Sequence, residues 1–482
     1  MTETLFEQLH SYSQSDYYPY HMPGHKRSNL GQMPESMLQI DITEIDGFDN
    51  LHQPEGILDD LQKQAAKLYG AEETFYLVNG STCGILSAIS AVLPEGGHLL
   101  MARGCHKSTY HAAYLRKLKI SYLYPEQVEG FDFQEAVAAE QIKLALEENP
   151  DIGAVFIVSP TYEGRVADVE KIARIVHEKG IPLIVDEAHG AHLGFAPGFA
   201  QNSCRQGADL VIHSVHKTLP SMTQTALLHV SGELVDRQRL RRFLHIYQTS
   251  SPSYVLMASI SDAMQIIDKQ GVTLFSTFRQ RYLSMCEQLK QCKHLRYISP
   301  NDIESCRQDV GKLVISTCET DVTGQWLYEV LCEKYHLQCE MAAGSYCLAM
   351  FTVADTEEAY RRMTEALLEI DKILTTRADY ETIAVIKHLP QPTIRYSLTE
   401  GWEQDYELTE LSESIERPVA DFINLYPPGI PLLVPGEVLT RDLYEKICTY
   451  QEQKLNVQGL VKQDGKYLIP IITQNNTADL LV

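Results

Sequence analysis

The stretch DIGAVFIVSPTYEGRVADVEKIARIVHEKGIPLIVDEAHG, residues 151–190, carries the pattern that decides the fold. Residues 152–158 and 181–186 are short apolar segments with the character of buried strands. Residues 168–180 between them have the amphipathic spacing of a helix. A strand, a helix and a second strand in this order are typical of a parallel sheet, because parallel strands need a crossover connection. The stretch therefore predicts an α/β layer fold.

The same alternation of strands and helices continues on both sides of this stretch. Upstream, residues 74–80 and 98–102 have strand character, and residues 57–70 and 81–93 have helix character. Downstream, residues 208–214 form another apolar strand. Nearly continuous apolar strands are typical of a sheet that is buried on both faces. We therefore expect a mostly parallel central sheet with helices on both faces.

The pattern changes after about residue 270. The segments that follow have the character of a strand, a helix, two strands and a helix, which predicts a smaller α+β domain. We expect an N-terminal arm and interface segment at 1–56, a large domain at 57–270, and one or more small C-terminal domains at 271–482.

Composition excludes several classes of partner and compartment. The chain has 64 acidic and 41 basic residues, a net charge of −23, which argues against binding to nucleic acid or to an anionic membrane. We find no basic segment leading into an apolar one at the start, and no run of 18 apolar residues, so we expect neither export nor a membrane span. The 11 cysteines are dispersed without a C-x-x-C spacing. This usage favours a reducing cytoplasm.

Polar clusters follow four of the predicted strands. They are residues 79–82, 159–162, 186–189 and 214–217. The carboxyl ends of parallel strands meet at one edge of the sheet, and ligands of such sheets bind there. We therefore expect these clusters to form one site.

Three of these clusters contain the groups that an aldehyde cofactor with a pyridine ring requires. Lys217 could bind the aldehyde, and Asp186 could keep the ring nitrogen protonated. Ser81 and Thr82, at the start of a predicted helix, could bind a phosphate. Each residue also has a plainer interpretation, as a surface charge, a helix cap or an ordinary N-cap. Two further candidates for the phosphate are Ser214 and His216.

The histidines allow a rival interpretation as a metal cluster. His189 and His192 form an H-x-x-H pattern. The pattern lacks the i, i+4 spacing of helical zinc motifs, so we expect no metal. The other members of the cluster would be Asp186, Glu187, His213 and His216.

Eight motifs in order along the chain resemble those of one enzyme family, the pyridoxal-phosphate-dependent ornithine/lysine/arginine decarboxylases of bacteria. The resemblance runs from about residue 18 to beyond residue 437. The motifs are HMPGHK (21–26), VNGST (78–82), RGCHKS (103–108), SPTYEG (159–164), VDEAHGAH (185–192), SVHKTLPSMTQ (214–224), TSSPSY (249–254) and YPPGIPLLVPGE (426–437).

The resemblance implies the fold-type-I architecture and a cytoplasmic homodimer whose active sites lie at the subunit interface. Residues 57–270 would be the domain that binds pyridoxal 5'-phosphate. The implied reaction converts lysine, arginine or ornithine to an amine and CO₂ through an external aldimine and a quinonoid intermediate. Larger members carry an N-terminal wing domain that builds decamers. Because HMPGHK already begins at residue 21, we expect the short form, to which the decamer does not carry over.

The resemblance also assigns roles to single residues. Lys217 would carry the internal aldimine, Asp186 would bind the pyridine nitrogen, His189 would lie beside the cofactor, and His106 would stack on its ring. From the reaction chemistry rather than the resemblance, His216 or the freed Lys217 could donate the proton to the former α-carbon, and the sequence does not choose between them. The phosphate would be bound by Ser81, Thr82, Ser214 and His216, with Thr249 or Ser250 reaching in from the neighbouring subunit.

The distal cation of a basic substrate needs a carboxylate at the far end of the pocket. Glu437 is our candidate by resemblance, and Asp49 is a second one. An acid at the start of a helix is the plainer interpretation of Glu437. The sequence does not decide between lysine, arginine and ornithine.

Two other functions fit the same scaffold. An aminotransferase or carbon–sulfur lyase would use Lys217 equally well, and Arg395 could then bind the substrate α-carboxylate. A non-catalytic binding protein would need none of the reactive groups. The presence of Lys217, Asp186 and the phosphate segment argues against it.

Overall fold

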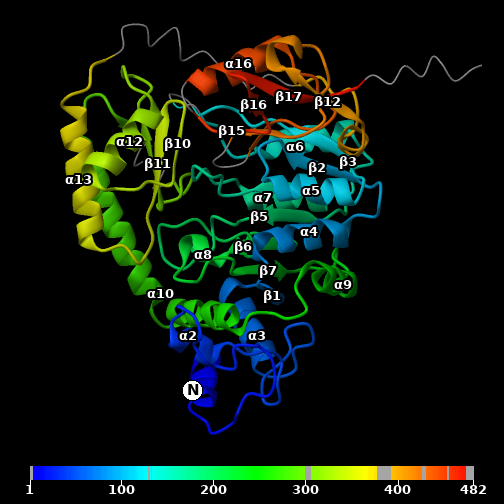
Figure 1. Cartoon of the computed structure of the whole chain (residues 1–482), viewed down its shortest axis with the longest axis vertical. Coiled ribbons are helices and arrows are strands. Elements are labelled where there is room, and N and C mark those ends of the chain that lie inside the picture. The colour runs from blue at the N-terminus through cyan, green and yellow to red at the C-terminus, as the bar shows by residue number, and fades with distance from the viewer. Residues whose placement is uncertain are drawn as a thin grey trace, which may run out of the picture.

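The computed structural model describes residues 4–128, 131, 133–298, 305–376, 392–425, 430–452 and 455–473. A seven-stranded sheet is at its centre, with the strand order β1-β7-β6-β5-β4-β2-β3 (Figure 1). Its strands are β1 (Glu73–Leu77), β2 (His98–Ala102), β3 (Lys119–Leu123), β4 (Ala154–Val158), β5 (Leu183–Asp186), β6 (Leu210–Ser214) and β7 (Ala226–Val230). β7 pairs antiparallel with β1 and β6, and the remaining pairs are parallel. The predicted mostly parallel sheet is confirmed.

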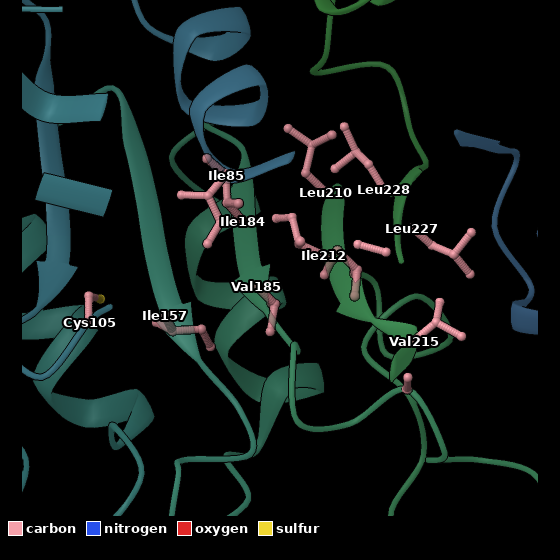
Figure 2. Packing of buried hydrophobic residues seen from close by; sticks show 14 of the residues in the cluster. Ile85, Cys105, Ile157, Ile184, Val185, Leu210, Ile212, Val215, Leu227 and Leu228 are labelled. Atoms are coloured by element: carbon pink, nitrogen blue, oxygen red, sulfur yellow. The ribbon is translucent and has the colours of Figure 1, made fainter. Parts of the chain in front are cut away.

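Helices cover both faces of this sheet, as alternate residues of β6 show. Ile212 packs against α4 (Gly80–Val92), where a Cβ added at Gly84 would lie 3.2 Å from Ile212. The next side chain, His213, has its ring centroid 4.6 Å from that of Tyr69, the last residue of α3 (Ile57–Tyr69). Successive strand residues point to opposite faces, so α3 and α4 lie on opposite sides. Figure 2 shows the apolar packing beneath α4, with Ile85 near Ile184.

A long helix joins the large domain to a smaller one. α10 (Tyr254–Leu289) packs on α3 at one end and on α13 (Glu357–Asp371) at the other (Figure 1). It is continuous through residue 270, where the sequence pattern changes. The other helices up to this point are α1 (Leu5–Ser13), α2 (Glu35–Ile40), α5 (Lys107–Leu115), α6 (Ala139–Glu148), α7 (Val169–His177), α8 (Val215–Thr218) and α9 (Arg237–Tyr247).

The smaller domain contains an antiparallel sheet in the order β10-β11-β9-β8. Its elements are β8 (Arg296–Tyr297), β9 (Lys312–Ser316), β10 (Met341–Ala343) and β11 (Tyr346–Met350), with α12 (Gly324–Tyr335) and α13 beside them. The first residue of β9 reaches back to the edge of the large sheet, because the Nζ of Lys312 lies 2.7 Å from Nδ1 of His189. The smaller domain therefore helps to close the site.

A third unit follows, with two three-stranded sheets and an apolar core of its own. The sheets have the orders β12-β17-β16 and β14-β13-β15. The elements are α15 (Leu398–Trp402), β12 (Tyr406–Glu410), η1 (Leu411–Glu413), β13 (Ile423–Leu425), β14 (Ile430–Leu433), α16 (Arg441–Glu452), β15 (Val457–Gln458), β16 (Val461–Gln463) and β17 (Lys466–Ile472). None of the helices in the described ranges is both long and apolar enough to cross a membrane.

Candidate active site

A cavity of about 720 Å³ lies at the carboxyl ends of the parallel strands. It collects residues from all four polar clusters, which are Ser81, Tyr162, Asp186 and Lys217 with their neighbours. Residues from the smaller domain and the third unit complete the wall, among them Glu340, Tyr346 and Leu432. The fold thus assembles one site from segments that are far apart in the sequence.

Lys217 lies in the cavity wall, within the single turn α8 that directly follows β6. Its side chain is half-buried, and its Nζ is 3.1 Å from Nε2 of His189. Burial lowers the pKa of Lys217, although the nearby carboxylate of Asp186 acts in the opposite direction. A lowered pKa increases the fraction of neutral amine, which is the form that attacks an aldehyde.

Asp186 is the last residue of β5 and is only 4% exposed. Its Oδ1 accepts a hydrogen bond of 3.1 Å from the backbone N–H of Ala188. Among the described residues its carboxylate has no bonded cation, and it also lines the cavity. Burial raises the pKa of Asp186, while Lys217 lowers it. A protonated ring nitrogen would supply the charge-assisted partner that this carboxylate lacks.

His189 lies between two lysines. Its Nε2 faces Lys217, and its Nδ1 is 2.7 Å from Nζ of Lys312. Its ring packs edge-on against Tyr162, with the two centroids 4.7 Å apart. Burial, followed by the charges of Lys312 and Lys217, holds the pKa of His189 well below its usual value. The imidazole is therefore neutral at physiological pH.

His106 and His216 line the same cavity. Burial, with a smaller effect of Lys217, lowers the pKa of His106 to about 4, so its ring is neutral and suited to stacking on an aromatic ring. Nδ1 of His216 is 2.8 Å from the carbonyl oxygen of Thr225. Because a carbonyl only accepts, Nδ1 carries the proton and Nε2 is left as the acceptor. Burial also lowers the pKa of His216.

The start of α4 presents the predicted phosphate site. Ser81 lines the cavity, and the Asn79 side chain makes no capping bond to the helix. Its Oδ1 instead accepts a hydrogen bond of 3.1 Å from the backbone N–H of Thr249. The amides of the first helical turn therefore remain available to an anion. Thr82 and Ser250 are exposed.

The residues present fit a pyridoxal phosphate. The Oγ of Ser214 is buried and has no hydrogen-bond partner in the described part of the chain. Leaving such a hydroxyl unpaired is costly. Ser214 is fully buried and is not itself in the cavity wall, but His216 and Lys217 just after it are. Lys217, Asp186 and Ser81 supply the three contacts that such a cofactor requires.

The structure does not bring the two predicted substrate acids into this cavity. Glu437 is 1% exposed and binds Nη2 of Arg103 and the backbone N–H of Val434, each at 2.9 Å. Asp49 accepts hydrogen bonds from the backbone N–H groups of Gly56 and Leu58, at 2.8 and 3.0 Å, and thereby caps the start of α3. Burial alone would raise the pKa of Asp49, but the backbone bonds lower it overall. Arg395 is exposed and also lies outside the cavity wall.

Acidic residues that the sequence analysis did not single out line the cavity instead. The Oε1 of Glu163 accepts a 2.8 Å hydrogen bond from the hydroxyl of Tyr346, and burial raises the pKa of Glu163. Glu340 accepts a hydrogen bond from the hydroxyl of Tyr162. Glu163 lies within the SPTYEG motif, which is a signal that could have identified it. Glu340 lies in no motif, and only the fold brings it to the site.

The residues of the rival metal cluster separate into different hydrogen-bonded groups. His192 bonds to Asp309 through Nε2 and Oδ1, at 2.7 Å. His213 bonds to Glu187 at 2.7 Å and to His229 at 2.9 Å. Across the described ranges, no three His, Cys, Asp or Glu side chains are arranged to hold a metal ion.

Comparison with solved structures supports the architecture. Lysine decarboxylase A from Pseudomonas aeruginosa superposes with a TM-score of 0.83 at 20% identity, covering 98% of this chain and 80% of that one. This likeness shows the fold, and the expected fold-type-I architecture of pyridoxal-phosphate enzymes is confirmed.

Sequence comparison identifies the family. The family models for the major domain and the C-terminal domain of Orn/Lys/Arg decarboxylase match residues 3–350 and 380–472. Arginine decarboxylase of Bacillus anthracis is 30% identical over 467 residues, which is 94% of each chain. Arginine decarboxylase of Bacillus subtilis (strain 168) is 30% identical over 452 residues, which is 91% of this chain and 92% of the other. The chain therefore belongs to the Orn/Lys/Arg decarboxylase family of enzymes.

Proposed function

We propose that this enzyme uses pyridoxal 5'-phosphate to decarboxylate a basic amino acid, with arginine, lysine and ornithine as the candidate substrates. The observation that carries the proposal is the placement in one cavity of the Lys217 amine and the Asp186 carboxylate, which has no bonded cation among the described residues. The phosphate-ready start of α4 lies at the same cavity. The family supports decarboxylation over the aminotransferase and lyase alternatives.

When bound, the cofactor supplies a protonated ring that accepts the electron pair left when the Cα–carboxylate bond breaks. Lys217 would hold it covalently through Nζ, and Asp186 would keep the ring nitrogen protonated. His106 would cover the ring face. Ser81 and Ser214 would bind the phosphate.

The reaction also needs a proton at the former α-carbon, because CO₂ leaves without one. Two groups in the wall can deliver it. Lys217 can do so from Nζ once the substrate amine has displaced it, and His216 can do so from Nε2 after taking up a proton there. The burial that lowers the pKa of both groups makes each a stronger acid at neutral pH.

Charge in the cavity wall supports a cationic substrate. Glu163 and Glu340 line the cavity together with Glu135, which is paired with Arg165. A carboxylate at the far end of a pocket is the natural partner of an ammonium or guanidinium group. Glu163 and Glu340 are therefore better placed for this role than Glu437 in the single chain.

Exposed apolar side chains support the expected homodimer. Tyr18, Tyr20 and Leu30 in the N-terminal segment are 67%, 89% and 98% exposed. Apolar side chains gathered in one segment favour burial against a partner.

The eleven cysteines are all free thiols, which supports a reducing compartment such as the cytoplasm.

The purified protein, loaded with pyridoxal phosphate, should release CO₂ from at least one of arginine, lysine and ornithine. Measuring kcat/KM for the three, with CO₂ and the amine product quantified together, ranks them. A Lys217→Ala variant is the matched control and should release none. Formation of a keto acid without CO₂ would instead support an aminotransferase.

A further inference from the structure

Lys312 is a buried lysine that contacts two residues of the cavity wall, because its Nζ is hydrogen-bonded to His189 and lies 5.5 Å from the centroid of the Tyr162 ring. It is the first residue of β9 and is 1% exposed. It does not line the cavity. In the part of the chain that the structure describes, the hydrogen-bond partner of its Nζ is Nδ1 of His189 at 2.7 Å, and no other is present. A lysine is seldom buried so completely, and a full charge there is costly without a partner.

His189 connects this lysine to the amine of Lys217. Its Nδ1 is 2.7 Å from Nζ of Lys312, and its Nε2 is 3.1 Å from Nζ of Lys217. A neutral imidazole has one donor and one acceptor nitrogen, whereas an ammonium group can only donate. If Lys312 donates to Nδ1, then Nε2 carries a proton and donates to Lys217, whose Nζ must be a neutral amine. In the opposite arrangement Lys217 is the ammonium and Lys312 is the amine.

Burial lowers the pKa of all three groups, and neighbouring charges modify each of them. Burial lowers the pKa of Lys312 to about 8, and Lys217 contributes to the lowering. Carboxylates on three other segments act in the opposite direction, and they are Asp309, Glu340 and Glu163. The pKa of His189 is lowered by burial and then by four neighbours, which are Lys312, Lys217, His106 and His192.

We propose that Lys312 is a positioning residue that acts on Lys217 through His189. Its ammonium group donates to Nδ1, so that the Nε2–H of His189 faces Lys217 and favours the neutral, nucleophilic amine there. The proposal deepens the proposed function, because it concerns the lysine that would bind the cofactor.

The same contacts allow a balanced transfer of protons. One proton passes from Nζ of Lys312 to Nδ1 of His189, while the Nε2 proton of His189 passes to Nζ of Lys217. Lys217 then becomes an ammonium group, Lys312 becomes a neutral amine, and the imidazole changes tautomer with no change in its charge. In both end states, each of the two hydrogen bonds between His189 and the lysines has one donor and one acceptor. Lys312 can thus supply a proton, through His189, to the Lys217 amine after the substrate has displaced Lys217 from the cofactor.

Competitive acylation of the full-length chain, freed of cofactor, tests the coupling. Acetic anhydride reacts with neutral amines, so the pH at which Lys217 is half-reactive, read by mass spectrometry of its peptide, reports its protonation. In Lys312→Met we expect this midpoint to rise by about one pH unit, because a nearby cation and a fixed Nε2–H donor are removed. Lys312→Gln, which is also uncharged, must shift the midpoint in the same direction and is the second variant if the Met variant does not fold.

Two controls separate this coupling from general electrostatics. Lys107 is an exposed lysine beside His106 that also acts on the charge of that histidine, so Lys107→Met removes a cation near the cavity without touching His189. It should leave the Lys217 midpoint unchanged. In a His189→Gln background, Lys312→Met should produce less than half of its shift, because the connecting imidazole is gone.

A folded Lys312→Met protein with an unchanged midpoint would overturn the inference, and so would an equal shift in Lys107→Met. A second measurement uses the cofactor-loaded chain, in which the pH midpoint of the visible absorbance of the Lys217 imine should rise in the same variants. Failure of the proposed function is distinguishable, since a chain that decarboxylates no basic amino acid can still show the acylation shift. A chain that does decarboxylate but shows no shift refutes only the role of Lys312.

Discussion

Asp186 illustrates how much a single side chain contributes at this site. Its carboxylate is buried at the end of a strand, and in the described residues its one donor is the N–H of Ala188. Burial of a carboxylate without a cation is unfavourable, which is why its pKa is raised. Under the proposed function, the protonated ring nitrogen of the cofactor would be the cation that this carboxylate lacks.

Asp186→Asn should lower kcat about 10²- to 10³-fold, because a neutral amide does not hold the proton on the ring nitrogen. The loss should appear in kcat/KM to a similar extent, and the variant should still form a borohydride-reducible bond to the cofactor at Lys217. Asp168→Asn is the matched control, since Asp168 only caps α7 through the N–H of Lys171. If the turnover of Asp186→Asn stays within threefold of the parent chain, Asp186 does not have this role.

At this scale the sequence predicts some residues and misses others for a physical reason. Asp186 ends the strand β5, and Lys217 lies in the single turn that follows β6, so the strand pattern itself places them at the ligand edge. Lys312 is 123 residues from His189, and nothing in its neighbourhood marks it as buried. Glu437 follows Pro-Gly and could be recognised as an acid, but its burial against Arg103 depends on a contact across 334 residues. The pattern of neighbouring residues in a sequence does not encode contacts between residues that are so far apart along the chain.

Among the elements, α3 shows how a polar residue can serve a helix rather than a substrate. The carboxylate of Asp49 accepts N–H groups from the start of this helix, which a helix cannot satisfy within itself. The capping role is an alternative to the predicted role of Asp49 as a substrate-binding acid. A substitution would affect stability in the first case and the KM for the substrate in the second.

Asp49→Ala should lower the free energy of unfolding by about 0.5–2 kcal/mol, the usual cost of a lost N-terminal cap. The KM for the basic amino acid should not change, because the side chain is turned to the helix. Chemical denaturation and steady-state kinetics on the same preparation test both statements. Asp59→Ala on the same helix removes an exposed ion pair with Lys63 and should cost less than 1 kcal/mol. A large rise in KM with normal stability would restore the substrate role.

The strand and helix pattern predicts the central sheet well because most of its strands are largely apolar and buried, as β2, β4, β5 and β6 are. The reversed direction of β7 is not visible in its composition, since an antiparallel strand in the middle of a buried sheet is as apolar as its parallel neighbours. The third unit is equally difficult. Its strands are short and partly exposed, and the core they share joins segments between Leu411 and Ile471.

On the scale of the whole molecule, the exposed N-terminal segment makes the proposed dimer testable. Tyr20→Glu combined with Leu30→Glu should shift the protein from dimer to monomer, because burying two carboxylates in an apolar interface is unfavourable. Light scattering coupled to size-exclusion chromatography measures the mass directly. Leu144→Glu, an exposed apolar residue on α6, is the matched control and should leave the mass unchanged. A parent chain that is already monomeric would refute the dimer.

The ion pair between Arg103 and Glu437 has a consequence for how the chain becomes a working enzyme. Arg103 directly follows β2, on the segment that leads to His106, and it is 5% exposed. Glu437 belongs to the third unit, near the end of the chain. A ribosome therefore completes the large sheet long before the only carboxylate bonded to this guanidinium in the described residues has been synthesised. Until Glu437 is in place, the Arg103 guanidinium lacks the carboxylate to which it is bonded in the folded chain, so the segment that leads to His106 gains this ion pair only when the third unit docks.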